Sequence, residues 1–169
     1  MNEYFQVFVS LGSNSADAAN MLDLARQALA SLPQMRLAAV SPIYSTAPQD
    51  YADQPWFLNQ VAELVVDARW RPCSLVDALL EVEVKLGRVR STDPALRFGP
   101  RTIDIDLLLF GEESSTDEHC LVPHPRLTQR AFALVPLLDL APDIMINGIS
   151  AATWLSRLRY AKDGQRISQ

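Results

Sequence analysis

The sequence contains no apolar run that approaches the ~20 residues needed to cross a bilayer, so we expect no transmembrane helix. The N-terminus lacks a signal-peptide pattern, because Asn2 and Glu3 directly precede a short strand-like segment. Only two cysteines occur, Cys73 and Cys120, and their spacing matches no metal-binding or redox motif. So few cysteines are typical of the reducing cytosol. We therefore expect a soluble cytoplasmic protein.

Lysine is also scarce, since thirteen of the fifteen basic residues are arginine and only two are lysine. The planar arginine side chain suits phosphate and carboxylate recognition, although genome composition produces the same bias. The formal net charge of −5 argues against nucleic-acid binding through a basic surface. With 49% apolar residues and no repeat or linker, residues 1–169 are predicted to form one domain with a buried core.

The most unusual segment runs from Gly99 to Gly111, where two carboxylates interrupt a run of branched apolar residues. The apolar run predicts a strand. Asp104 and Asp106 are two residues apart, so a strand places both on one face, roughly 6–7 Å apart along the chain. Aspartate is depleted in strands, and bare charges are unfavourable on a buried face. We therefore expect a positive partner for this pair.

Two kinds of positive partner are consistent with the carboxylate pair: arginine side chains and divalent metal ions. Four arginines lie just upstream, at Arg88, Arg90, Arg97 and Arg101. Hard cations such as Mg²⁺ prefer carboxylate oxygens and share them with substrate phosphates. Carboxylates, arginines and metal ions together are the groups that phosphoryl transfer requires. The alternative is an edge strand with a solvated acidic face.

Periodicity predicts the element order β-α-β-β-α-β. We expect strands at 4–11, around 37–44, at about 56–67 and in the apolar run that follows Arg101, helices at 18–32 and 72–87, and short helices at 130–138 and near Trp154. Pro42 indicates that the second strand is an edge strand or contains a bulge. This order predicts a ferredoxin-like α+β domain, with an antiparallel sheet and helices on one face. The long loops 45–55 and 88–100 are expected to be mobile and to fold over a site beside Asp104 and Asp106.

Several residues outside the carboxylate strand also suggest a site. Alternation places Phe57, Asn59 and Val61 on one strand face, where the ring could stack on a flat heterocycle and the amide could read its edge. Structural hydrogen bonding is the alternative role for Asn59. Glu83 lies at the margin of a helical apolar stripe, where it could contact a ligand, orient arginine or form a salt bridge. Residues 12–14 (Gly-Ser-Asn) lack the phosphate-loop pattern and are interpreted as a helix-capping turn.

Taken in chain order, the motifs resemble the 6-hydroxymethyl-7,8-dihydropterin pyrophosphokinase family over nearly the whole length. That family transfers pyrophosphate from ATP to the pterin alcohol in folate biosynthesis and releases AMP. The resemblance rests on these segments: Leu11-Gly12-Ser13-Asn14, Tyr44-Ser45-Thr46-Ala47-Pro48, Asp53-Gln54-Pro55, Phe57-Leu58-Asn59, Gly87-Arg88-Val89-Arg90, Arg97 to Asp106, Pro123-His124-Pro125-Arg126 and Arg130-Ala131-Phe132. The ordered set is far more specific than an isolated Asp-x-Asp pair.

The resemblance implies a role for each matching residue. Asp104 and Asp106 would hold two Mg²⁺ ions between ATP and the pterin hydroxyl, while Arg88 and Arg101 would stabilise the transferring phosphates. The positions that match ATP contacts are Glu83, Arg90, Arg97, Phe98, Arg101, His124 and Arg130. The positions that match pterin contacts are Thr46, Ala47, Gln49, Phe57, Asn59 and Phe132. No motif residue is an obvious general base, so that role is unassigned.

We therefore expect a Mg²⁺-dependent pyrophosphokinase with ATP and 6-hydroxymethyl-7,8-dihydropterin as its partners. A monomer without nucleic-acid or membrane partners is expected. Two alternatives stay open. A nucleotidyl transferase or metal-dependent phosphohydrolase built on the same strand would release pyrophosphate or phosphate instead of AMP. A noncatalytic α+β RNA-binding module would turn over no ATP.

Overall fold

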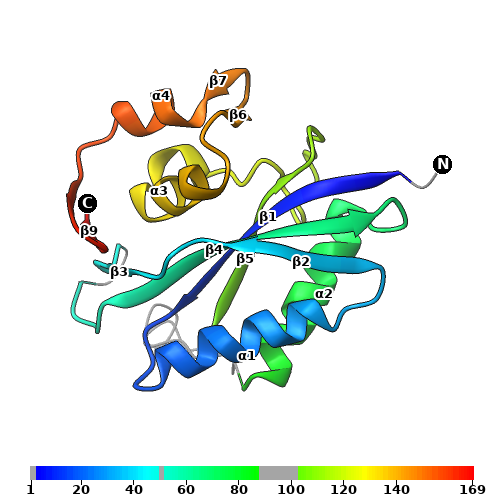
Figure 1. Cartoon of the computed structure of the whole chain (residues 1–169), viewed down its shortest axis with the longest axis horizontal. Coiled ribbons are helices and arrows are strands. Elements are labelled where there is room, and N and C mark those ends of the chain that lie inside the picture. The colour runs from blue at the N-terminus through cyan, green and yellow to red at the C-terminus, as the bar shows by residue number, and fades with distance from the viewer. Residues whose placement is uncertain (1–2, 50–51, 88–102) are drawn as a thin grey trace.

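The computed structural model describes residues 3–49, 52–87 and 103–169, in which one sheet separates two helical layers (Figure 1). The strands are β1 (Tyr4–Ser13), β2 (Met35–Val40), β3 (Tyr44–Thr46), β4 (Phe57–Asp67), β5 (Asp104–Phe110), β8 (Ala161–Asp163) and β9 (Arg166–Ser168), with a separate hairpin of β6 (Met145–Ile146) and β7 (Ile149–Ser150). The helices are α1 (Ala18–Ala30), α2 (Pro72–Lys85), α3 (Ala131–Leu140) and α4 (Ala151–Ser156), with the short 3₁₀ helix η2 (Leu127–Gln129). No helix of the described ranges is long and apolar enough to cross a membrane.

The strand order of the sheet is β5-β1-β4-β3-β9-β8, and β2 pairs with β4 beside β3. Pairing among β1 to β5 is antiparallel, as predicted, but β3 and β9 are parallel. The predicted second strand is split into β2 and β3 around Pro42, because proline cannot donate a ladder hydrogen bond. The C-terminal strands β8 and β9 were not predicted; they are only three residues long and mostly exposed.

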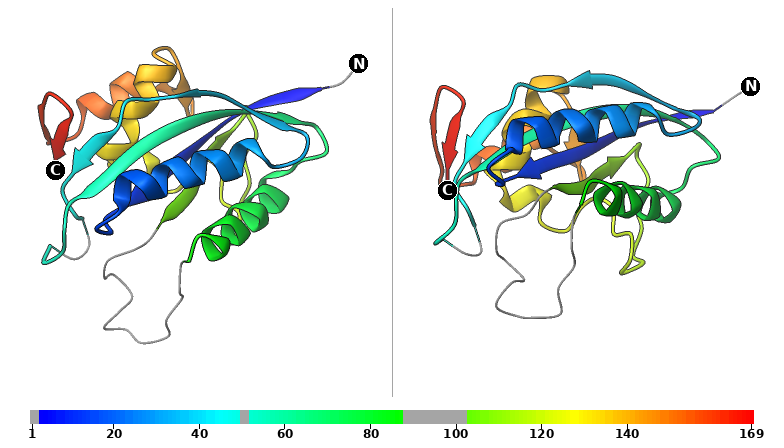
Figure 2. Two further views of the ribbon diagram at one scale, coloured as in Figure 1. Left: turned by 60° about the horizontal axis from the view of Figure 1, so that its bottom comes forward. Right: turned by 90° about the horizontal axis from the view of Figure 1, so that it is seen from below.

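Helices cover both faces of the sheet rather than one (Figure 2). Helices α1 and α2 lie on the same face, as predicted, where they pack on β1 residues such as Val7 and Val9. Helices α3 and α4 lie on the opposite face, over Phe8, Val61 and Leu108. The one-face prediction is wrong for the C-terminal helices because these central strands carry apolar side chains on both faces, and each face needs a cover.

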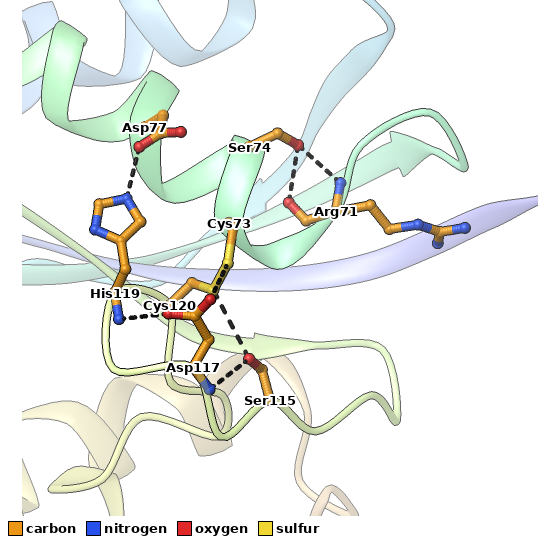
Figure 3. The surroundings of a disulfide bond; sticks show 8 residues. All are labelled: Arg71, Cys73, Ser74, Asp77, Ser115, Asp117, His119 and Cys120. Carbon is orange, nitrogen blue, oxygen red and sulfur yellow. Dashed lines mark hydrogen bonds and ion pairs between the residues drawn. A yellow bond between two sulfur atoms is a disulfide. The ribbon is translucent and has the colours of Figure 1, made fainter.

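A disulfide joins Cys73, in the first turn of α2, to Cys120 in the segment after β5 (Figure 3). The two residues are 47 positions apart and their Cα atoms are 4.9 Å apart. A second link joins the same elements, since His119 Nε2 lies 2.6 Å from Asp77 Oδ1. The spacing-based interpretation missed this bridge because only tertiary packing brings the two sulfurs together.

Candidate active site

The carboxylate pair occupies the start of β5, at the edge of the sheet. Ile105, between them, is buried among the α1 and α2 side chains, whereas Asp104 and Asp106 are only partly buried and point away from that layer. The two aspartates therefore share a face, as the alternation predicts. In the register of β1, Asp104 is opposite Gly12 and Asp106 is opposite Ser10.

A cavity of about 100 Å³ opens on this face. Its walls come from four strands and from the first turn of α3. The lining residues are Ser10, Gly12, Thr46, Ala47, Gln49, Gln54, Phe57, Asn59, Asp104, Asp106, Arg130 and Phe132. All six residues to which the family resemblance assigns a pterin contact lie in this set, although they are spread over 87 positions of the sequence. The fold therefore gathers the predicted pterin residues around the carboxylates.

Asn59 is held in place from two sides. Its Nδ2 donates a 2.6 Å hydrogen bond to Thr46 Oγ1 in β3, and its side chain is only 6% exposed. On the other side it lies over Gly12, where an added Cβ would collide with Asn59 Oδ1. A larger residue at position 12 would therefore force the Asn59 side chain to move. The structural role of Asn59 is present, and the amide retains hydrogen-bonding capacity for a ligand.

Asn14 has a different role from the one expected. Its Nδ2 donates to Gln54 Oε1 at 2.8 Å and to the Pro55 carbonyl oxygen at 3.2 Å. The N-cap of α1 is Asp17, which makes no side-chain capping bond. The helix-capping interpretation is therefore wrong: Gly12 and Ser13 belong to β1, and Asn14 anchors the end of the loop before β4.

A second cavity, of about 360 Å³, lies between α2, β5 and the segment around His124. Glu83 and His124, which match ATP contacts, both line it. Among the described lining residues, Asp104 and Asp106 alone belong to both cavities. The two cavities therefore meet at the carboxylate pair.

Glu83 is more deeply buried than its position at the margin of the apolar stripe suggested, with only 2% exposed. Its Oε1 accepts a 2.8 Å hydrogen bond from the backbone N–H of Ile105. Because β5 is an edge strand, this N–H needs a partner outside the sheet ladder. Glu83 thus fixes the strand between the two aspartates.

His124 is neutral at physiological pH. Burial, together with the nearby positive charges of Arg130 and Arg126, lowers the pKa of its imidazole to about 4. Its Nδ1 accepts a 3.1 Å hydrogen bond from the Arg126 backbone N–H, so the ring proton is on Nε2. The His124 N–H donates to the Leu108 carbonyl at 2.9 Å, which ties this segment to β5. His124 therefore presents a neutral N–H donor.

The remaining candidates divide into two groups. Arg130, which matches an ATP contact, lines the first cavity, with its guanidinium 5.3 Å from the Phe132 ring centroid. Five predicted residues lie outside the described ranges: Arg88, Arg90, Arg97, Phe98 and Arg101. Sequence reasoning missed Ser10 as a lining residue, although a polar residue between Val9 and Leu11 in an apolar strand was a usable signal.

The family model of 7,8-dihydro-6-hydroxymethylpterin-pyrophosphokinase (HPPK) matches residues 8–142, which contain β2 to β5, most of β1 and all the cavity-lining residues. The chain belongs to the HPPK family. Among its HPPK relatives, the 2-amino-4-hydroxy-6-hydroxymethyldihydropteridine pyrophosphokinase of Pseudomonas aeruginosa is 47% identical over 141 residues, 83% of each chain. The protein of that name from Methylorubrum extorquens is 40% identical over 153 residues, covering 90% of this chain and 93% of the relative.

The HPPK fold is also found in solved structures. A crystal structure of Plasmodium falciparum HPPK-DHPS, wild type with pteroate, matches with a TM-score of 0.69 at 13% identity. The match covers 93% of this chain and 45% of that one, so the chain spans less than half of the Plasmodium chain. At this identity the likeness shows the fold alone.

Proposed function

We propose that this chain transfers the pyrophosphoryl group of ATP to 6-hydroxymethyl-7,8-dihydropterin and releases AMP, as expected of an HPPK family member. The observation that carries the proposal is the meeting of two cavities at Asp104 and Asp106. Group transfer between two substrates requires their reacting atoms to be held side by side. A pterin in the smaller cavity and ATP in the larger one would meet at this pair.

The first cavity suits a flat, polar heterocycle. Phe57 and Phe132 supply ring faces for stacking. The amide of Asn59, held in place by Thr46, supplies hydrogen bonds. Thr46 at the end of β3, with Ala47 and Gln49 in the loop after it, closes the rim. Stacking combined with a buried amide is the pattern expected for a pterin ring.

The carboxylate pair suits Mg²⁺. Asp104 and Asp106 offer oxygen donors, the ligand type that Mg²⁺ prefers, and neither is sealed within the core. We propose that the pair holds two Mg²⁺ ions together with ATP oxygens. When bound there, Mg²⁺ would neutralise the negative charge of the phosphate oxygens during phosphoryl transfer. Glu83 keeps the strand backbone between the aspartates in place through Ile105.

We propose an in-line displacement. The pterin hydroxyl oxygen forms a bond to the β-phosphorus of ATP, the bond from that phosphorus to the oxygen of AMP breaks, and the hydroxyl proton is released. On the ATP side, His124 offers its Nε2–H, and we assign Glu83, Arg90, Arg97, Phe98 and Arg130 to nucleotide binding. Arg88 and Arg101 are assigned to the transferring phosphates. The strand order β5-β1-β4, with β2 and β3 beside β4, supports the finer description of the core as ferredoxin-like.

The test is product analysis. Protein is incubated with ATP, Mg²⁺ and the reduced pterin alcohol, and nucleotides and pterins are separated by chromatography. We expect AMP and pterin pyrophosphate in equal amounts, formed only when the pterin is present. Release of pyrophosphate or phosphate without AMP would instead identify a nucleotidyl transferase or phosphohydrolase. No turnover by folded protein would contradict the proposal.

A further inference from the structure

The C-terminal strand β9 is bonded to the segment that forms one wall of the first cavity. β9 pairs in parallel with β3, with Thr46 opposite Ile167. The pairing continues beyond β3, where the Ala47 N–H donates to the Ile167 carbonyl at 3.0 Å. Figure 1 shows β9 beside β3 at the end of the sheet. The backbone that presents Thr46 and Ala47 is thus held by the last strand of the chain.

Gln169, the residue that follows β9, is also bonded to the opposite wall. Gln169 Oε1 accepts a 2.8 Å hydrogen bond from the Ala131 N–H, and its Nε2 donates to the Gln129 carbonyl at 2.7 Å. Ala131 begins α3, and the first N–H groups of a helix have no partner within it. Arg130, the N-cap residue, makes no side-chain capping bond. Gln169 therefore caps the helix from which Phe132 projects.

Between these two attachments, β9 is packed rather than loosely tethered. Ile167 is 1% exposed and lies in a cluster with Tyr44, Ala131 and Val135. Arg166 places its guanidinium 3.8 Å from the Trp56 ring centroid, one residue before Phe57. Both walls of the cavity are therefore fastened to one segment, made of β9 and Gln169 directly after it.

We propose that β9 sets the width of the first cavity and that Gln169 is a positioning residue for the pterin. This inference rests on the proposed assignment of that cavity to the pterin. Gln169 acts through the backbone around Ala131 and is not among the residues that line the cavity. Removing its side chain returns the Ala131 N–H at the start of α3 and the Gln129 carbonyl at the end of η2 to water, and loosens Phe132. Arg130 lies beside this cap, but Glu83 and His124, which are also assigned to nucleotide binding, line the second cavity, so we expect pterin binding to change more than ATP binding.

The experiment compares Gln169→Ala, Gln169→Glu and the matched control Lys162→Ala, an exposed change on the neighbouring strand β8. Each substrate is varied separately in the AMP assay. For Gln169→Ala we expect the pterin KM to rise about 10-fold, the effect of losing one or two hydrogen bonds, with a much smaller change in the ATP KM. Gln169→Glu keeps the acceptor for the Ala131 N–H and should restore part of the loss. Lys162→Ala should match the parent chain.

Three results would overturn the inference: an unchanged pterin KM in Gln169→Ala, equal rises in both KM values, or no recovery in Gln169→Glu. Thermal unfolding of each variant separates loss of fold from loss of positioning, because Gln169 is exposed and its change should leave the fold intact. Asn59→Ala serves as the reference for the cavity itself. If it raises the pterin KM and Gln169→Ala does not, positioning by Gln169 is wrong. If Asn59→Ala has no effect, the cavity assignment is wrong and the inference falls with it.

Discussion

The two faces of β1, β4 and β5 have the same backbone but opposite chemistry. Toward α1 and α2, alternate positions such as Val9, Leu64 and Ile105 are apolar and buried, and the buried Gln60 on this face is bonded to Arg26 of α1. Toward α3, the face is apolar only under the helix and turns polar at one end, where Asn59 and Asp104 line the cavities. A period of two thus places a core and a site on the same strands. One face is therefore a closely packed core, whereas the function of the other face depends on a cavity.

The largest expected effect is on the polar face. Asp104→Ala or Asp106→Ala should lower turnover by about 100-fold or more, because the proposed metal ions and phosphates lose their carboxylate ligand. The melting temperature should change little, since both side chains are only partly buried. The AMP assay and thermal unfolding measure the two quantities, with the exposed Asp143→Ala as control. Near-normal turnover in either variant would refute the metal assignment.

A substitution on the face toward α1 and α2 should lower stability and leave substrate binding unchanged. Leu64 is fully buried between the sheet and the first helical layer. Leu64→Ala should lower the free energy of unfolding by about 3 kcal/mol, through lost burial and a residual cavity. Urea unfolding measures this loss, and the KM values of the folded fraction should match those of the parent chain. A large change in KM without loss of stability would mean that the two faces are not separate.

The stability of the protein should depend on pH through His124. Its pKa is about 4 in the folded protein against 6.5 in the unfolded chain, so the unfolded state binds more protons between these values. The contribution of this residue to stability is therefore complete above pH 6.5 and falls by up to about 3 kcal/mol as the pH drops toward 4. Urea unfolding gives the free energy of unfolding of the parent chain and of His124→Gln across this range. The difference between the two free energies should shrink as the pH falls from 6.5 to 4. Parallel curves would show that His124 titrates normally.

The smallest effect on activity and stability is expected at Gly12 in β1, which lies against Asn59 in β4. Gly12→Ala places a Cβ against the Asn59 amide, and the side chain must move. We expect the pterin KM to rise about 10-fold with a modest loss of stability, since overpacking costs about 1–3 kcal/mol. Ser13→Ala, at the adjacent β1 position, provides the control, and substrate titration gives both KM values. An unchanged pterin KM would mean that the position of Asn59 does not matter for binding.

Periodicity alone was sufficient to place the main strands and the polar face. The same-face placement of Asp104 and Asp106 follows from their spacing, and that of Phe57 and Asn59 follows in the same way. Other features depend on partners far away in the sequence. The bond from Glu83 to Ile105 spans 22 residues, and the one from Gln169 to Ala131 spans 38, so no local pattern reveals either. The roles of Arg88, Arg90, Arg97, Phe98 and Arg101 stay predictions, since they lie outside the described ranges.

The Cys73–Cys120 bridge has a consequence for how the chain comes apart. It closes the residues between the two cysteines into one covalent ring, and that ring includes α2 and β5. A protease that cuts once between residues 74 and 119 would produce two peptides that still migrate as one molecule. Only a reductant would separate them. Every residue assigned here to the metal ions and to the transferring phosphates is carried on that loop.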